Sequence, residues 1–149
     1  MKNLRPELIS LLKRGSCTPR LSTLATKTRS KATTIHYNIK QMESAGVIKT
    51  YKAVFDYKKI DAGFCTFVLV NLDRNEYKSP EDMGSMLAEY PEIESVDIVT
   101  GGWEMLLKVR TKDIDEYYEF SKKVLSLRGI ERTQSLSSLL QIKTEFIKM

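Results

Sequence analysis

The sequence predicts an α+β protein in two parts, a winged helix-turn-helix followed by a ferredoxin-like βαββαβ domain. Apolar residues recur at helical spacing up to Gly46, whereas from Gly63 onward apolar and β-branched runs alternate with helical segments. Basic residues are concentrated in the first part. The 149 residues, 42% of them hydrophobic, are enough for one domain or two small ones with a buried core. We assign residues 1–50 to the first domain, 51–62 to a strand and linker, and 63–149 to the second.

Three short helices are predicted in the first part. The first covers about residues 3–14, and the second covers about residues 19–26, with Thr18-Pro19 as its cap and first helical residue. Ser30 is predicted to cap the third helix, which ends at Gly46. The inward stripe of this third helix is Ala32, Ile35, Ile39 and Met42. The β-branched and aromatic stretch 47–55 that follows predicts a strand or wing.

The second part follows the order strand, helix, strand, strand, helix, strand. The apolar run 64–70 predicts a buried strand, Ser79-Pro80 is typical of a helix start, and Gly101-Gly102 indicates a turn. The later strands contain Ile93, Val96 and Ile98, then Met105, Leu107 and Val109, and finally residues 131–143. In the first helix of this part, the residues predicted to face inward are Met83, Met86, Leu87 and Tyr90. The second helix runs from Asp113 to about Leu127, and its predicted inward residues are Ile114, Tyr117, Ser121, Val124 and Leu125.

Two helices can cover only one face of such a sheet. The continuous apolar run 64–70 indicates burial on both sides, so we expect a second subunit to cover the other face. The sequence therefore predicts a homodimer. A two-fold dimer would also present two copies of the helix-turn-helix, about one turn of duplex apart.

Charge is distributed unevenly along the chain. Residues 1–60 carry 13 Lys and Arg against 3 acidic residues, whereas residues 61–149 carry 11 against 16. The first part is thus suited to a polyanion such as DNA. A lysine-rich solvated surface is the alternative explanation when charge is considered alone.

Several classes of protein are disfavoured by composition. No apolar run is long enough to span a membrane, and the N-terminus lacks the long uncharged core of a signal peptide, so we expect a cytoplasmic protein. Cys17 and Cys65 form no CxxC pair, and His36 is the only histidine, which argues against a zinc site. No cofactor is predicted. Nucleophile elbows of the GxSxG type and phosphate loops of the GxxxxGK type are absent from the sequence.

The outward face of the third helix is predicted to read DNA. Its hydroxyl, amide and ammonium groups can contact phosphate oxygens or base edges, and the helix N-terminus favours phosphate. The candidate DNA-binding residues are Lys27, Arg29, Ser30, Lys31, Thr33, Thr34, Tyr37, Lys40 and Gln41. The alternative is an ordinary solvated helix face.

Residues 30–49, 99–109 and 132–137 of the chain together resemble the Lrp/AsnC family, the leucine-responsive or feast/famine regulators. Residues 30–49 look like the family's recognition helix running into its "GVI" wing. Residues 99–109, VTGGWEMLLKV, are similar to its effector-loop signature, and residues 132–137 resemble its closing strand. Asn38 departs from the family pattern, in which an arginine is frequent at this position.

The resemblance implies a DNA-binding transcription regulator that is not an enzyme and that forms dimers, tetramers or octamers. It also implies that a small effector such as an amino acid binds between the second domains. The implied effector-binding residues are Thr100, Gly101, Gly102, Trp103, Glu104, Ser135 and Ser137. The ligand's ammonium would meet Glu104, and its carboxylate would meet backbone N–H groups around Gly101 and Gly102. One carboxylate that is common in the family's loop is missing here.

Other interpretations of the same features remain open. Without the resemblance, Gly101-Gly102 is simply a hairpin turn, Trp103 a core or interface aromatic and Glu104 a surface charge. A second alternative is an enzyme on the same scaffold, a tetrapyrrole decarboxylase, because the sirohaem decarboxylases of tetrapyrrole synthesis resemble this family in both domains. Against it, His36 lies in the predicted recognition helix and not in the second domain. A third alternative is a protein-interaction module that has the helix-turn-helix shape without binding DNA.

Overall fold

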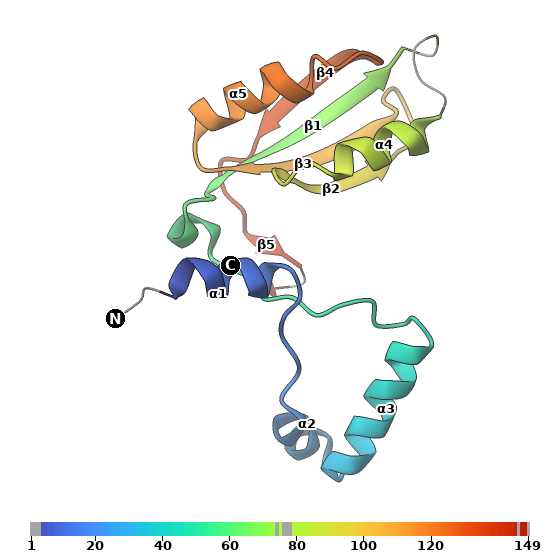
Figure 1. Cartoon of the computed structure of the whole chain (residues 1–149), viewed down its shortest axis with the longest axis vertical. Helices are drawn as coiled ribbons and strands as arrows, with labels where there is room; N and C mark the ends of the chain where they lie inside the picture. Colours follow the sequence, from blue (N-terminus) through green and yellow to red (C-terminus); the bar gives the residue numbers. More distant parts are fainter. Residues whose placement is uncertain (1–3, 74, 76–78, 146, 149) are drawn as a thin grey trace. The chain divides into compact units, whose positions relative to one another are not determined.

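The computed structural model describes residues 4–73, 75, 79–145 and 147–148 (Figure 1). The chain divides into two compact units, residues 1–54 and 55–149. Among the described residues, no helix is both long and apolar enough to cross a membrane.

The N-terminal unit contains the helices α1 (Arg5–Lys13), α2 (Leu21–Thr28) and α3 (Ala32–Ser44). The predicted cap at Thr18-Pro19 is wrong, because α2 begins two residues later, after Arg20 in an extended conformation. Ser30 is not the cap of α3 either. Its hydroxyl donates to the Thr28 carbonyl oxygen at 3.3 Å, and Lys31 occupies the cap position.

The end of α3 confirms the sequence prediction. Gly46 has φ +70°, a left-handed conformation that glycine adopts without steric cost. The Val47 N–H donates to the Met42 carbonyl at 2.9 Å, and the Gly46 N–H donates to the Glu43 carbonyl at 3.0 Å. This pair of bonds is a Schellman motif, which satisfies carbonyl groups at the helix end.

The predicted strand or wing over residues 47–55 is not formed. The segment has no regular secondary structure, and within the described residues no strand pairs with it. A strand needs a neighbour to accept its backbone hydrogen bonds, so β propensity alone does not make one. In the polar stretch after it, Tyr57–Ile60 forms the 3₁₀ helix η1.

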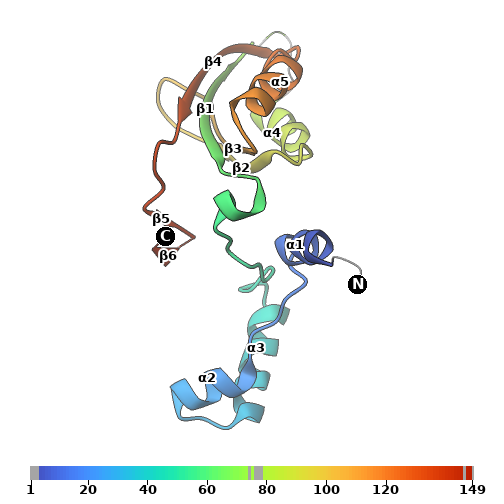
Figure 2. The same ribbon diagram turned by 90° about the vertical axis from the view of Figure 1, so that its left-hand side faces the viewer.

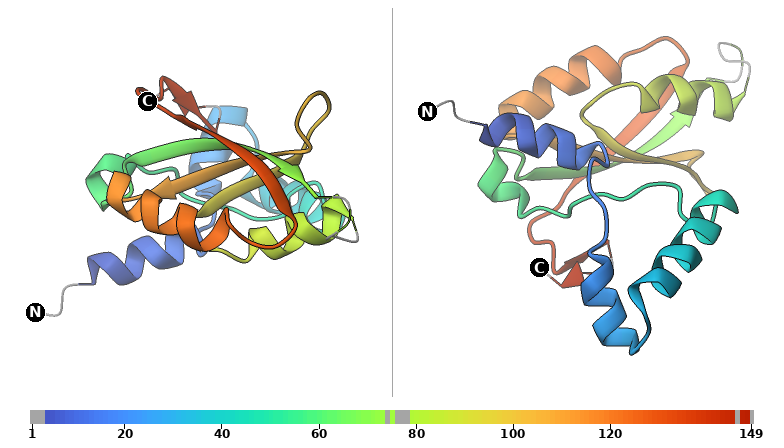
Figure 3. Two further views of the ribbon diagram at one scale, coloured as in Figure 1. Left: turned by 90° about the horizontal axis from the view of Figure 1, so that it is seen from above. Right: turned by 60° about the horizontal axis from the view of Figure 1, so that its bottom comes forward.

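The C-terminal unit confirms the predicted βαββαβ order. It contains β1 (Phe64–Leu72), α4 (Pro80–Ala88), β2 (Ile93–Ile98), β3 (Met105–Thr111), α5 (Ile114–Val124) and β4 (Ile130–Ser137). The strands lie in the order β2-β3-β1-β4, and every neighbouring pair is antiparallel. Both helices lie on the same face of the sheet (Figures 1 and 3).

Both helices of this unit begin at side-chain caps. Ser79 accepts a hydrogen bond from the Asp82 N–H, with Pro80 in the first turn, and Asp113 accepts one from the Glu116 N–H. The core lies between these helices and the sheet and comprises Val68, Val70, Leu72, Met83, Leu87, Met105, Leu107, Val109, Phe120 and Val124.

In α4 and α5, two predicted inward residues are exposed and one core residue was missed; in α3, Ala32 and Met42 of the predicted inward stripe are exposed as well. Met86 is 43% exposed and Ile114 is 64% exposed, whereas Phe120 is buried. In each helix the packed stripe is narrower than predicted. It runs through Met83 and Leu87 on α4, and through Phe120 and Val124 on α5.

The face of the sheet opposite the helices, called here the open face, is only partly covered. Residues of β1 that point toward the helices, such as Val68, are fully buried, whereas Phe67 and Leu69 are half-buried and Leu136 is 47% exposed. The predicted burial of β1 on both faces is therefore not reached within one subunit.

The last strand is also shorter than predicted, because the chain leaves the sheet after Ser137. The short strands β5 (Lys143–Thr144) and β6 (Ile147–Lys148) form a separate hairpin.

A charged cluster at one end of the open face connects η1 to the sheet. Glu94 pairs with Arg110 at 3.0 Å and with Lys108 at 3.2 Å, and it accepts a hydrogen bond from the Tyr57 hydroxyl at 3.3 Å. The Arg110 guanidinium lies 3.7 Å from the centre of the Tyr57 ring. Burial alone would raise the pKa of Glu94, but Arg110 and Lys108 outweigh burial and lower it.

The lowered pKa of Glu94 predicts a contribution to stability that depends on pH. Because the folded-state pKa is below the unfolded one, the stabilisation is present above the unfolded value and disappears as pH falls through the folded value. Glu94→Gln should lower the free energy of unfolding by about 1–3 kcal/mol at neutral pH. Urea denaturation should show this difference shrinking in acid, and the exposed Glu89→Gln should match wild type at every pH. A constant difference down to acid pH would contradict the ion-pair cluster.

Candidate DNA-binding and effector sites

Helices α2 and α3 are joined by the tight turn Arg29–Lys31 (Figure 2). Arg29 adopts a left-handed conformation with φ 53°, which is uncommon for a residue with a side chain. The Ser30 N–H donates to the Ala25 carbonyl at 3.0 Å and closes the end of α2. The turn therefore depends on a backbone conformation that local periodicity did not reveal.

All nine candidate DNA-binding residues are exposed. Lys27 is in the last turn of α2, the turn holds Arg29, Ser30 and Lys31, and Thr33, Thr34, Tyr37, Lys40 and Gln41 lie along α3. The first turn of α3 contains no acidic residue, and the cap residue Lys31 makes no side-chain capping bond. The residues before and in this first turn are therefore basic or hydroxyl-bearing and exposed, a composition that suits phosphate at a helix N-terminus.

Lys40 has an acidic partner that the sequence reasoning missed. Its Nζ lies 2.8 Å from Glu43 Oε2, and the Tyr51 hydroxyl donates to Glu43 Oε1 at 3.1 Å. The hydrogen bond with Glu43 raises the pKa of Lys40, and the bonds from Lys40 and Tyr51 lower the pKa of Glu43. The three-residue spacing of Lys40 and Glu43 was the available signal. The ammonium of Lys40 has three donors, so it can keep this contact while it meets a phosphate, but the nearby carboxylate weakens its attraction for an anion.

Asn38, the departure from the family pattern, turns back onto its own helix. Its Nδ2 donates to the Thr34 carbonyl at 2.8 Å. This bond uses one of the two amide donors of Asn38 and holds the side chain against the helix backbone. The position therefore lacks the long, cationic reach that an arginine would supply.

The loop between β2 and β3 is held by backbone hydrogen bonds at both sides. The Val99 N–H donates to the Glu104 carbonyl at 3.0 Å, and the Glu104 N–H donates to the Val70 carbonyl at 3.1 Å. Gly101 has φ +115°, which favours glycine, so the predicted turn at Gly101-Gly102 is confirmed.

Side chains from three segments fix this loop. Glu104 Oε2 accepts a hydrogen bond from the Leu72 N–H at 2.7 Å, and Asn71 Nδ2 donates to the Gly102 carbonyl at 3.2 Å. The Arg132 guanidinium lies 4.4 Å from the centre of the Trp103 ring. Glu104 thus anchors the end of β1, a structural task in addition to the predicted ligand contact.

A depression of about 390 Å³ lies beside the loop, and its lining is acidic. It is formed by Asn71, Leu72, Asp73, Asn75, Gly101, Gly102, Trp103, Glu104 and Glu131. Three of these residues carry carboxylates, and none is basic. The buried Asn71 Oδ1 has no hydrogen-bond partner among the described residues. An ammonium group would satisfy this set of acceptors.

The structure groups some of the predicted effector residues and separates others. Gly101, Gly102, Trp103 and Glu104 line the depression, whereas Thr100 does not. Ser135 hydrogen bonds to the Tyr117 hydroxyl of α5, and Ser137 is paired with Thr66, so both serines lie on the helix-covered side of the sheet. Sequence reasoning missed Asn71, Asp73, Asn75 and Glu131; the polar Asn71 at the end of an apolar run was the only local hint.

The C-terminal unit matches a known family. Residues 65–146 match the family model of the Lrp/AsnC ligand binding domain. The chain belongs to the Lrp/AsnC family. It is similar to an uncharacterised HTH-type transcriptional regulator of Pyrococcus furiosus, with 30% identity over 126 residues, 84% of each chain. This Lrp/AsnC protein is accordingly an HTH-type transcriptional regulator and not an enzyme.

Solved structures share the architecture. An AsnC family transcriptional regulator from Agrobacterium tumefaciens is 26% identical and superposes with a TM-score of 0.74, covering 97% of this chain and 94% of that one. A transcriptional regulator of Neisseria meningitidis in complex with L-methionine is 25% identical, with a TM-score of 0.74 over 92% and 88% of the two chains. The predicted order of N-terminal helix-turn-helix and βαββαβ domain is thereby confirmed for this Lrp/AsnC protein, without the predicted wing.

The Lys40–Glu43–Tyr51 contacts generate a prediction that can be tested without a ligand. Glu43→Gln removes the carboxylate, so the pKa of Lys40 should fall toward its ordinary value. NMR titration of the Lys40 side chain measures this change. Glu89→Gln, in the C-terminal unit, is the matched loss of one carboxylate and should leave the pKa of Lys40 unchanged. An unaltered pKa in Glu43→Gln would show that the ion pair does not form in solution.

Proposed function

We propose that the chain is a sequence-specific, dimeric DNA-binding regulator whose affinity for DNA is changed by a small amino-acid effector. The observation that carries the DNA-binding proposal is the uncapped N-terminus of α3, which lacks acidic residues in its first turn. Lys27, Arg29 and Lys31 surround this helix end on exposed positions. We infer that α3 enters the major groove, with these cations on phosphates and Tyr37 and Gln41 on base edges.

Dimerisation is supported by the open face of the sheet. Phe67, Leu69 and Leu136 leave apolar surface exposed there, and a second copy would bury it. A two-fold dimer presents two α3 helices to DNA and therefore reads two related half-sites. Larger assemblies, tetramers or octamers, would be built from such dimers.

The acidic depression is our candidate effector site. The structure of the similar Neisseria regulator contains L-methionine. In the present chain, carboxylates and the Asn71 side-chain oxygen line the depression and can accept hydrogen bonds from an ammonium group. Backbone N–H groups around Gly101 and Gly102 would receive the ligand's carboxylate. An effector changes DNA affinity only if it binds the DNA-bound and free forms with different free energies.

Selection from a random pool of DNA duplexes tests the DNA-binding proposal. At a salt concentration of about 0.15 M the protein should enrich a partly palindromic site, and affinity should fall steeply as salt rises. Lys31→Ala should weaken binding to most sequences and reduce the salt slope by about 1, whereas Tyr37→Ala or Gln41→Ala should change sequence preference. Lys112→Ala, an equal loss of charge in the C-terminal unit, is the control. Absence of enrichment would reject the proposal and favour a protein-interaction module.

Titration with L-methionine tests the effector proposal. Glu131 is exposed, so Glu131→Gln should leave the fold intact while weakening methionine binding about tenfold through loss of a charge-assisted contact. N-acetyl-L-methionine, which lacks the ammonium group, should bind poorly. Calorimetry on both ligands measures this, with Glu89→Gln as the control. Equal binding of the acetylated and free amino acid would show that the acidic depression is not the site.

A further inference from the structure

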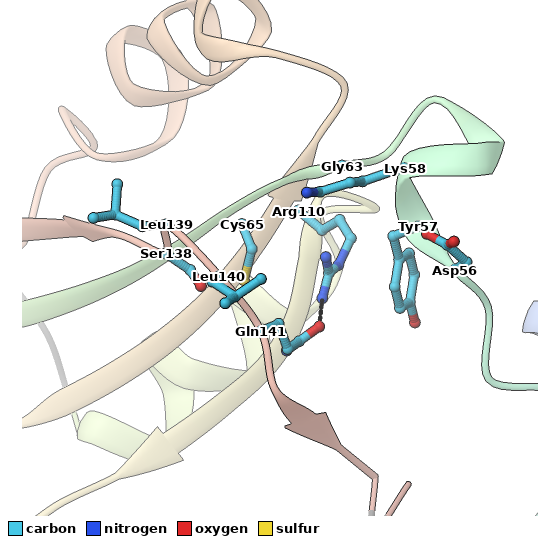
Figure 4. A pocket seen from close by; sticks show the side chains of 10 residues that line it. All are labelled: Asp56, Tyr57, Lys58, Gly63, Cys65, Arg110, Ser138, Leu139, Leu140 and Gln141. Carbon is cyan, nitrogen blue, oxygen red and sulfur yellow. Dashed lines mark hydrogen bonds between the residues drawn. The ribbon is translucent and has the colours of Figure 1, made fainter. Parts of the chain in front are cut away.

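A second and separate cavity lies at one end of the open face. It encloses about 480 Å³ between η1, the paired ends of β1 and β3, and the segment that follows β4. Figure 4 shows the Arg110 guanidinium directed toward Gln141, with Tyr57 on one side of it, Cys65 and Leu140 on the other, and the Lys58 side chain above it. None of these residues borders the acidic depression.

We propose that this cavity is a second small-molecule site, for an organic monocarboxylate with a short apolar tail and no ammonium group. It goes beyond the effector proposal, because its chemistry is opposite to that of the acidic depression. It does not depend on DNA binding. The candidate ligand class is that of the 2-oxo acids, which keep the carboxylate and side chain of an amino acid but lack its ammonium.

Arg110 is the anion-binding group. Its side chain is only 8% exposed, and burying a guanidinium requires partners for its donors. Of its five N–H donors, hydrogen bonds among the described residues engage two: Nε with Glu94 at 3.0 Å, and Nη2 with Gln141 at a long 3.5 Å. A ligand carboxylate could accept from the terminal nitrogens in the two-point geometry that guanidinium favours.

The charges around the cavity favour an anion. Glu94 is shared by two cations, Arg110 and Lys108, and Lys58 adds a third beside the cavity. Asp56 also borders the cavity, but its carboxylate lies 3.5 Å from Lys59 Nζ. Glu145 also acts electrostatically on Tyr57. The lining itself holds two basic residues, Lys58 and Arg110, and one acidic residue, Asp56, in contrast to the three carboxylates of the acidic depression.

The opposite wall of the cavity is apolar. Within one subunit, Leu139 and Leu140 are 96% and 71% exposed, which is unusual for large aliphatic side chains, and the buried Cys65 thiol lies beside them. Covering these leucines with a ligand's hydrocarbon tail would remove apolar area from water. A carboxylate at Arg110 and a tail against Leu140 together fit a small branched acid.

Calorimetric titration of the full-length protein with 4-methyl-2-oxopentanoate tests the proposal, with L-leucine as the matched compound that carries an ammonium. The oxo acid should bind saturably and more tightly than leucine at this site. Arg110→Gln should weaken its binding about tenfold or more, because a charge-assisted pair is lost. Glu131→Gln, in the acidic depression, should leave binding of the oxo acid unchanged.

A second variant distinguishes lost ligand binding from a folding defect in Arg110→Gln. Leu140 is exposed, so Leu140→Asp should fold normally while placing a repelling carboxylate at the cavity, and it should also abolish most of the binding. Ile142→Asp, at a neighbouring exposed position that does not line the cavity, should bind like wild type. Three results would overturn the proposal: the oxo acid shows no saturable binding up to about 10 mM, Leu140→Asp binds it like wild type, or Glu131→Gln weakens its binding.

Discussion

The C-terminal unit depends on a four-stranded antiparallel sheet that packs both of its helices on one face. Strand pairing buries Val68, Leu107 and their neighbours completely against α4 and α5, while the other face keeps Phe67 and Leu69 half-buried. Hydrophobic burial on one side therefore supplies the stability of this unit. The uneven covering also leaves the surface on which we place the dimer contact, and both candidate ligand sites are formed where chain segments leave the strand ends.

The two candidate ligand sites have opposite charge, although β1 contributes to both. At one end of this strand, Asn71 and the Gly101-Gly102 turn border a depression whose lining, among the described residues, has three carboxylates and no basic residue. At the other end, Cys65 is opposite Arg110 in the strand pairing. The carboxylate of Glu94 pairs with both Arg110 and Lys108, so it balances only one of their two positive charges. One strand thus separates a site suited to an ammonium from a site suited to a carboxylate. Such a chain could respond separately to an amino acid and to its deaminated product.

Local sequence predicted helix starts and ends correctly wherever they depend on residues close together in the chain. The helix starts at Ser79 and Asp113 and the helix end at Gly46 were predicted, because each is made by residues within a few positions of one another. The errors arose where several local options compete. Thr18 and Ser30 have side chains that commonly cap helices, but Arg20 and Lys31 occupy the cap positions of α2 and α3, and neither makes a side-chain capping bond. Stretch 47–55 has strand propensity but no partner strand among the described residues.

The sequence by itself determined the helix-turn-helix followed by βαββαβ, the basic first part and the turn at Gly101-Gly102, because periodicity, charge and glycine act over short distances. Only the tertiary structure decided which side chains meet. Pairing of β1 with β3 and β4 brings Asn71 to the loop and Glu131 to the same depression, and it moves Ser135 and Ser137 to the helix side. The register of the strands brings together residues that are far apart in the sequence. Composition and local spacing do not specify which strand pairs with which, or in what register.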